Sequence, residues 1–291
     1  DEPAMRLSYF EHAAAVFDRL TRLLIEDGRS AEAFDTAERK RARSLLDRLG
    51  DHDRVRPPLA TWEELAKLIP GDVLIIQYAV LGDQIHGWCA RPKELAPFRL
   101  GATRAAVERA IERNDGRWLF EVLVASVPAA ASWKGRLVIV PDGPLHRLAF
   151  ASLVAPDGTY AVEKWPMTIA PSTNAFLRLR QRSPRPSALL AMGVADGDAP
   201  RLPRADDELR EVAALYPRSE VLMAGRATRH AFLAEATNAD TIHFAGHATM
   251  ADGLLLAGRG GHLAAREVAA MNLPRRPIVV LAACCTAAGK G

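Results

Sequence analysis

Two short segments carry side chains suited to nucleophilic catalysis. The segment TIHFAGHATM (241–250) is an apolar run that ends at His247, and PIVVLAACCTAAGKG (277–291) is another apolar run, followed by Cys284 and Cys285. A free thiol has a pKa of about 8.5, and only its thiolate is a strong nucleophile. A nearby imidazole can take the thiol proton and later return it to a leaving amine. The residue types therefore favour acyl transfer by a cysteine and a histidine.

The two segments must be neighbouring strands for this chemistry to work. Each is almost wholly apolar, which is typical of a strand buried on both faces. The interval between His247 and Cys284 is long enough for a hairpin and a crossover helix. Neighbouring strands lie about 4.8 Å apart, so we expect the imidazole and the thiol to emerge at one edge of the sheet. The small residues around both would let a substrate carbonyl approach backbone N–H donors.

Composition restricts the class of protein. The 291 residues are 49% hydrophobic and 25% charged, with a formal charge of +3, as in soluble globular proteins. Basic and acidic residues are intermixed, so no direct nucleic-acid binding is predicted. No apolar run approaches the roughly 20 residues that span a bilayer, and no signal peptide opens the chain. Three cysteines do not form a disulfide framework, and we expect a cytoplasmic protein without membrane contact.

Residues 1–50 are predicted to form a helical hairpin. Apolar residues recur at helical spacing in both halves, Gly28 suits a left-handed C-cap, and Ser30 suits an N-cap. Such a pair is similar to one tetratricopeptide repeat, and it also fits an ordinary helical hairpin.

Two α/β units are predicted to follow. The first (55–183) contains a hairpin around Gly82 and Asp83 and a buried strand in RLVIVPDGPL. The proline-rich segment RSPRPS marks the boundary. The second unit (187–291) alternates apolar strands with helices, which predicts a parallel sheet covered by helices. Functional groups of such sheets gather beyond the carboxyl ends of the strands.

The motifs resemble those of a known family. HFAGHA followed by VVLAACCTAAG is similar to the His and Cys motifs of the CHAT family, whose members are caspase-like, related to separases and usually preceded by tetratricopeptide repeats. Further segments match in the same order: AERKRARSLLDRL, LVIVPDGPLHRLAFASL, IAPSTNAFLRL and GRATRHAFL. The resemblance covers nearly the whole chain. It implies a caspase-like, parallel-rich sheet flanked by helices in 187–291, and a pseudo-caspase-like unit in 55–183.

The resemblance also implies roles for individual residues. It places the catalytic base on His247 and the nucleophile on Cys284, with Gly246 and the N–H groups of Ala248 and Cys284 bordering the oxyanion site. Two positions depart from the family pattern, because its usual glycine after the histidine is Ala248 and the serine of its Leu-Ser-Ala-Cys is Ala282. No metal and no cofactor are implied.

The implied activity is that of a cysteine endopeptidase. Its substrate would be a specific protein of bacterial defence or cell death, gasdermin-like pore formers among them, and a regulatory partner would act through the N-terminal repeat region. The alternative is a catalytically silent caspase-like scaffold. Because family members continue past this cysteine, we interpret the chain as truncated after the Cys strand and expect a chain ending at Gly291 to lack substrate specificity.

Other polar groups have simpler interpretations. His243 is predicted to be structural, hydrogen-bonded in or near the sheet, although a zinc set of His243, His247 and Cys284 is an alternative. Cys285 is expected to face away from Cys284, and Cys89 to be a small buried residue. The segment VPDGPLHR, with an exposed-looking aspartate and histidine, is predicted to be a turn.

Overall fold

The structure is a computed structural model that describes residues 2–49, 59–180, 187–193, 202–249 and 253–283. The chain divides into two compact units. The first contains residues 1–48 and 52–182, and the second contains residues 183–290. The helical hairpin is part of the first unit.

Within the described residues, the first unit is built on a five-stranded sheet in the order β3-β2-β1-β4-β5. The strands are β1 (Val73–Leu81), β2 (Gln84–Arg91), β3 (Glu94–Thr103), β4 (Arg136–Val140) and β5 (Met167–Ile169). β1, β2 and β3 form an antiparallel meander, whereas β4 is parallel to both β1 and β5. The predicted hairpin is confirmed, and Gly82 supplies the left-handed conformation of its turn (φ +69°).

Alternate residues of β1 enter two separate cores, one on each face of the sheet. Helices pack against both faces and complete these cores. One core receives the helical hairpin, α3 and α7, and the other receives α4 and α5. The helices are α1 (Glu2–Glu26), α2 (Ser30–Leu49), α3 (Trp62–Leu65), α4 (Arg104–Glu112), α5 (Gly116–Phe120), α6 (Ala161–Lys164) and α7 (Thr173–Arg180). Short helical segments of other types are the π-helix η1 (Glu121–Ala125) and the 3₁₀ helices η2 (Gly143–Arg147) and η3 (Phe150–Ser152).

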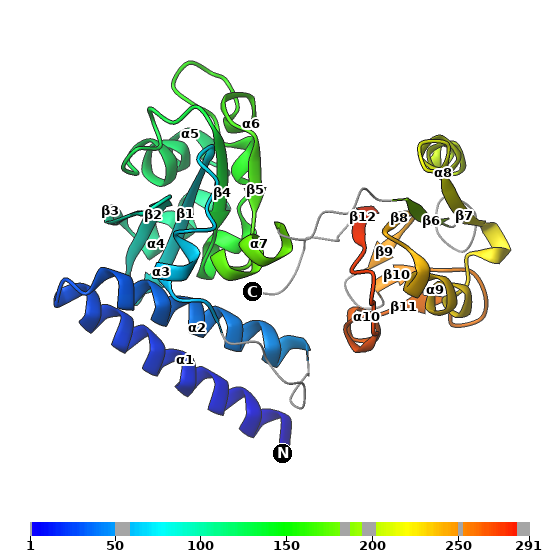
Figure 1. Ribbon diagram of the computed structural model, residues 1–291, viewed down its shortest axis with the longest axis horizontal. Helices are drawn as coiled ribbons and strands as arrows, with labels where there is room; N and C mark the ends of the chain where they lie inside the picture. The colour runs from blue at the N-terminus through cyan, green and yellow to red at the C-terminus, as the bar shows by residue number, and fades with distance from the viewer. Residues whose placement is uncertain (1, 50–58, 181–186, 194–201, 250–252, 284–291) are drawn as a thin grey trace. The chain divides into compact units, whose positions relative to one another are not determined.

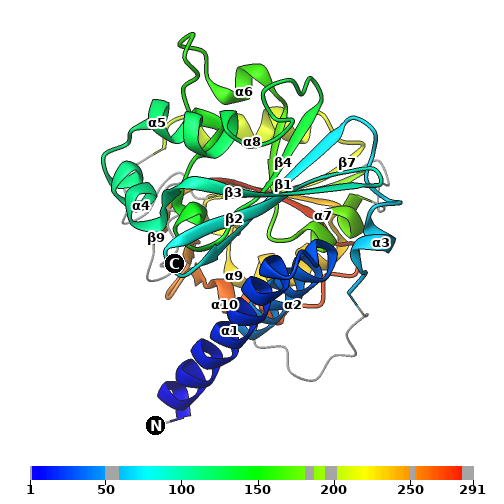
Figure 2. The same ribbon diagram turned by 90° about the vertical axis from the view of Figure 1, so that its left-hand side faces the viewer.

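The two helices of the N-terminal hairpin run side by side and lie against the sheet (Figures 1 and 2). Gly28 takes the left-handed conformation expected of a C-cap (φ +73°), and α2 begins at Ser30, which is its first helical residue rather than the predicted N-cap. The ring of Phe34 is fully buried and packs edge to face against Trp62 (5.6 Å) and Trp88 (5.8 Å). α2 is therefore part of the core that the helical hairpin, α3 and α7 form with the sheet.

In the part of the second unit that the structure describes, four parallel strands pair in the order β12-β8-β6-β7. They are β6 (Ala188–Gly193), β7 (Arg218–Met223), β8 (Thr241–Ala245) and β12 (Ile278–Ala282). The predicted parallel sheet is confirmed. A small antiparallel sheet contains β9 (Ala248–Thr249), β10 (Gly253–Leu255) and β11 (His262–Leu263).

Helices pack on both faces of the parallel sheet. Residues of α8 join one core, and residues of α9 and α10 join the other. The helices are α8 (Ala205–Ala213), α9 (Arg229–Glu235) and α10 (Ala265–Ala270), with the short turns η4 (Ala224–Arg226) and η5 (Ala236–Asn238). None of the described helices combines the length and the apolar character that crossing a lipid bilayer requires.

Candidate active site

The strands that lead to the candidate histidine and cysteine are adjacent and parallel. β8 pairs with β12, with Ala245 opposite Ala282. His247 follows Ala245 by two positions in the sequence, and Cys284 follows Ala282 by two. The expectation that the two strands are neighbours is confirmed. Cys284 itself lies outside the described residues, as do Cys285 and the terminal GKG.

The backbone around His247 is anchored to both sheets. The N–H of Gly246 donates to the carbonyl of Ala282 in β12 (3.2 Å), and the carbonyl of His247 accepts the N–H of Leu255 in β10 (2.9 Å). The histidine is half-buried between β8 and β9. Its main chain is therefore fixed on one side by the strand that precedes the cysteine and on the other by the small sheet.

The residues on either side of His247 suit a close backbone approach. Gly246 is buried, and a Cβ at this position would lie 2.7 Å from the ring of Phe244, so a larger residue does not fit without rearrangement. Ala248 lies in β9 opposite Leu254. Alanine adopts this extended conformation without strain, so its place in the family's glycine position costs nothing here. The assignment of Gly246 and Ala248 to an oxyanion site stays a prediction.

The first histidine of the segment, His243, is a structural residue, as predicted. Nε2 of His243 lies 2.8 Å from Oε1 of Glu208 on α8, and the His243 side chain is buried. Thr241, two positions earlier in the same strand, accepts a hydrogen bond from the hydroxyl of Tyr216 (3.2 Å). Among the described residues, no group of three or more His, Cys, Asp or Glu side chains is placed to hold a metal ion.

The sequence did not reveal how the strands of this sheet are held together at their amino ends. Oδ2 of Asp240 accepts the N–H groups of Ser187 and Ala188 (3.1 and 3.0 Å), and Oδ1 accepts from Arg275 (3.0 Å). The Asp240 carbonyl accepts the N–H of Ile278 (3.0 Å). The hydrogen bond from the Ser187 N–H, followed by those from the other donors, lowers the pKa of Asp240 to about 2. One aspartate thus joins the starts of β6, β8 and β12.

The third cysteine is inert. Cys89 is buried in β2, and its thiol lies 3.1 Å from the carbonyl of Pro128. Burial raises its pKa to about 12. The prediction of a small buried residue is confirmed. A thiol with so high a pKa carries almost no thiolate near neutral pH, so Cys89 is a poor nucleophile.

The aspartate of VPDGPLHR is not exposed, contrary to its appearance in the sequence. Asp142 follows β4, its side chain is only 15% exposed, and it accepts the N–H of Val80 (2.8 Å). The predicted turn is present as η2, and His146 within it is exposed. The aspartate is drawn inward because Lys40 of α2 lies 3.7 Å from its Oδ2, a long-range partner that the local sequence does not show.

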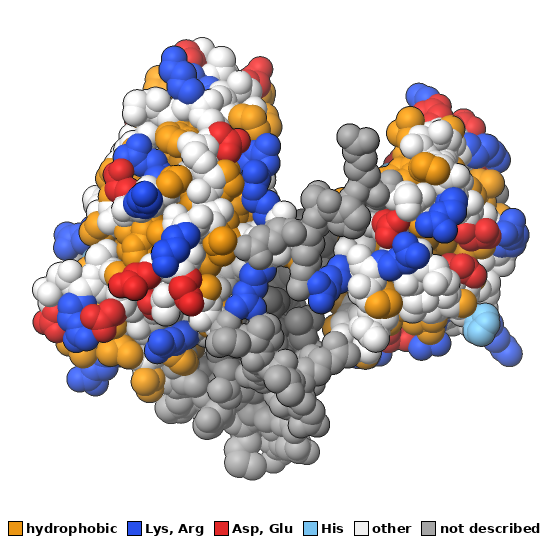
Figure 3. Space-filling view, in the orientation of Figure 1, with side chains coloured by type: hydrophobic (Ala, Val, Ile, Leu, Met, Phe, Trp, Pro, Cys, Tyr) orange, Lys and Arg blue, Asp and Glu red, His pale blue; other side chains and the backbone are white. Residues whose placement is uncertain are grey.

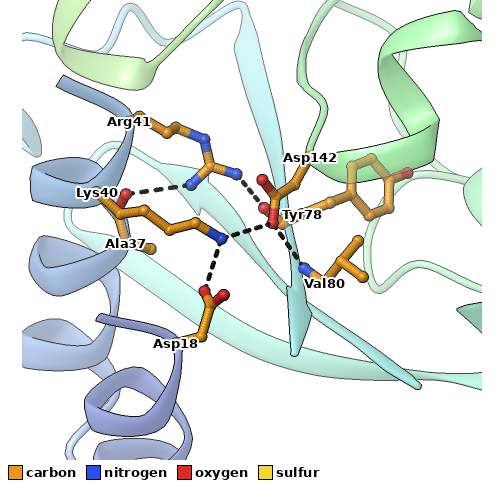
Figure 4. Close-up of polar contacts among 7 residues, drawn as sticks. All are labelled: Asp18, Ala37, Lys40, Arg41, Tyr78, Val80 and Asp142. Carbon is orange, nitrogen blue, oxygen red and sulfur yellow. Dashed lines mark hydrogen bonds and ion pairs between the residues drawn. The ribbon is translucent and has the colours of Figure 1, made fainter. Parts of the chain in front are cut away.

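Asp142 belongs to a network that ties the helical hairpin to the strand ends of the first unit (Figure 4). Lys40 also pairs with Asp18 of α1 (2.6 Å), and Arg41 donates to the carbonyl of Tyr78 in β1. Burial opposes ionisation of Asp142, but Arg41, Lys40 and the Val80 N–H outweigh it and hold its pKa below the usual value. Burial raises the pKa of Asp18 despite Lys40.

Comparison with known families identifies this architecture. The model of the CHAT domain matches residues 113–291, which include β4 and β5 of the first unit and the whole of the second. The matched residues contain His247, Cys284 and the paired strands that lead to them. No curated protein matches the chain at a significant level. Because the match spans more than half of its length, the chain belongs to the CHAT domain family, a family of caspase-like cysteine proteases.

Proposed function

We propose that this protein is a cysteine endopeptidase in which Cys284 is the nucleophile and His247 is the general base and acid. The observation that carries the proposal is the parallel pairing of β8 with β12, in which Ala245 lies opposite Ala282. Each strand is followed, after the same number of residues, by one member of the pair. Neighbouring strands about 4.8 Å apart suit proton transfer between side chains at their ends.

The chemistry follows from these two groups. His247 takes the proton of the Cys284 thiol, and the thiolate forms a C–S bond to the scissile carbonyl carbon. The tetrahedral oxyanion collapses as the C–N bond breaks, and the imidazolium gives its proton to the leaving amine. Water, deprotonated by the same imidazole, then hydrolyses the acyl-enzyme and regenerates the thiol.

The oxyanion would be bordered by Gly246 and by the N–H groups of Ala248 and Cys284. Buried Gly246 presents no side chain, and Ala248 continues in an extended strand. The Gly246 N–H already donates to Ala282, so its contribution is space rather than a donor. Preorganised N–H donors of this kind are worth about 10²–10³-fold in rate.

The substrate class and the regulation rest on family membership. We assign to this chain a specific protein substrate of bacterial defence or cell death, a gasdermin-like pore former among the possibilities, and a cytoplasmic setting. We also assign a caspase-like fold to residues 187–291 and a pseudo-caspase-like role to 55–183. The Lys40–Asp142 contact supports regulation through the helical hairpin, because it joins α2 to strand ends of the first unit.

The decisive test is covalent labelling of the full chain by a mixture of peptide acyloxymethyl ketones. Labelling should be lost in Cys284→Ala and His247→Ala and retained in Cys285→Ala, the matched control one position away. Labelling that persists in Cys284→Ala, or that is absent from the wild-type protein in every state tested, contradicts the proposal.

A catalytically silent caspase-like scaffold is the second candidate. The two departures from the family pattern, Ala248 and Ala282, favour it. Full rescue of biological function by Cys284→Ala would establish the scaffold. Loss of function in that variant, with unchanged stability, would exclude it.

A further inference from the structure

We propose that the second unit binds a phosphate-bearing small molecule in a basic pocket beside α9. The pocket has a volume of about 590 Å³, within the range of about 300–1,000 Å³ that is typical of small-molecule sites. It is formed by the segment 228–230 at the start of α9, the loop 257–262 and the start of α10. Its residues are distinct from those of the proposed acyl transfer, so the two proposals stand or fall separately.

The charges of the pocket favour an anion. Three arginines line it, Arg229, Arg259 and Arg266, against one acid, Glu267, so the difference is two positive charges. Glu267 is already paired with Arg229 (2.6 Å). Within the described part of the chain, neither Arg259 nor Arg266 makes an ion pair.

Two histidines, His230 and His262, also line the pocket and add further hydrogen-bonding groups. Figure 3 shows basic side chains and a histidine exposed on the α9 end of the second unit. Guanidinium groups without a carboxylate partner are suited to bidentate binding of phosphate oxygens.

The loop of the pocket offers backbone donors as well. Gly258 and Gly260 have positive φ (+95° and +67°), and a Cβ on either would meet no atom within 4 Å, which leaves the loop surface open. As far as the described residues extend, the N–H groups of Gly258, Arg259 and Gly260 donate to no other group. Successive free N–H groups in a glycine-rich loop are a common means of binding phosphate.

The base of the loop is held in place, so the pocket is preformed. The N–H of Ala257 donates to the carbonyl of Ala227 (2.9 Å), and Leu256 donates to Gly261 (2.7 Å). Gly261 cannot carry a side chain, since a Cβ there would lie 2.1 Å from the Leu256 carbonyl oxygen. A preformed site loses less conformational entropy when its ligand binds.

The number of donors distinguishes phosphate from a single carboxylate. One aspartate or glutamate side chain is satisfied by one guanidinium. Two unpaired guanidinium groups, two imidazoles and free backbone N–H groups instead match the three oxygens and the higher charge of a terminal phosphate. A ligand with a single carboxylate is therefore less suitable.

The test is isothermal titration calorimetry of the full chain with inorganic pyrophosphate at low ionic strength. We expect Arg259→Ala combined with Arg266→Ala to weaken binding about tenfold or more. Arg210→Ala combined with Arg218→Ala is the matched control, because it removes the same charge from α8 and the start of β7, and binding should change less than about twofold. Glu267→Gln, which keeps an acceptor for the Ala264 N–H, should strengthen binding severalfold.

Three results would overturn the proposal. The first is absence of pyrophosphate binding by the wild-type chain. The second is equal weakening by the pocket and control pairs, which would indicate only a general effect of net charge. The third is displacement of pyrophosphate by hexaglutamate at a lower concentration than pyrophosphate itself requires, which would indicate a site for acidic peptides.

Discussion

The carboxyl ends of the parallel strands serve different purposes in the two units. In the first unit, Asp142 follows β4 and is held by Lys40 of the helical hairpin, while Arg41 donates to the carbonyl of Tyr78 within β1 (Figure 4). In the second unit, His247 follows β8, and its neighbours make backbone hydrogen bonds to β10 and β12. The first edge carries charged side-chain contacts, whereas the main chain around His247 at the second edge is anchored by backbone hydrogen bonds.

This difference determines which edge can transfer protons. A general base is most effective when its pKa lies near the working pH. Arg41 and Lys40 outweigh burial and hold the pKa of Asp142 below its usual value, so this carboxylate stays ionised and is a weak base near neutral pH. An imidazole, as at His247, is the side chain most often used as a general base. The same position in two sheets is therefore used for anchoring in one and for proposed chemistry in the other.

The largest effect should come from the second edge. His247→Ala should slow inactivation by a peptide acyloxymethyl ketone by about 10²–10⁴-fold, because the general base is lost. Asp142→Asn should leave the rate per folded molecule within about twofold. Second-order inactivation rate constants, corrected for the folded fraction, measure both. An equal decrease of the inactivation rate in the two variants would contradict the proposal that only the second edge transfers protons.

The next largest effect should be on stability of the first unit. Asp142→Ala leaves Lys40 without one of its two carboxylates and the Val80 N–H without an acceptor, and should cost about 3 kcal/mol. Because the pKa of Asp142 is lowered in the fold, its stabilisation is complete above the usual value of about 4 and is lost as pH falls through the folded value. Urea unfolding of wild type and variant as a function of pH tests this. A constant difference down to pH 2 would be inconsistent with it.

Local patterns in the sequence were sufficient to predict the parallel strands of the second unit and the hairpin turn of the first, whereas β3 was not predicted. The apolar runs around Phe244 and Val280 are strands because parallel strands buried on both faces need apolar residues throughout. Gly28 and Gly82 mark the turns because each needs positive φ. His243 was correctly predicted as structural, since it lies within such a run.

Side-chain contacts between distant segments could not be predicted. Asp142 looked exposed because its partner Lys40 lies far away in the sequence, on another element. Asp240 was missed for the same reason, since its donors come from Ser187 and Arg275. The segment GRGG (258–261) places glycines beside an arginine, which was a usable signal for an anion site.

A smaller effect is expected at the amino edge of the second sheet. Asp240→Ala removes the acceptor of the Ser187 and Ala188 N–H groups and should cost about 2 kcal/mol in the second unit. The pKa of Asp240 is lowered to about 2, first by the Ser187 N–H. The contribution of its charge is therefore present above about pH 4 and is lost between about pH 4 and pH 2.

Hydrogen exchange of the β6 and β12 amides, compared with amides of the first unit, provides the measurement for Asp240. The first unit serves as the internal control, because its sheet does not contain this residue. Faster exchange in both units, or in neither, would show that Asp240 does not join the strands of the second sheet.

The smallest effect separates the two histidines of the segment 241–250. Glu208→Ala removes the partner of the buried His243 imidazole and should cost about 1 kcal/mol. Glu208→Gln keeps an acceptor and should cost less. Neither variant should change the rate of labelling at Cys284, because His243 faces α8 and bonds to it, whereas His247 lies beyond the end of β8. Thermal unfolding and inactivation rates measured on the same samples test both statements, and a slower rate in Glu208→Gln would mean that the two histidines act together rather than separately.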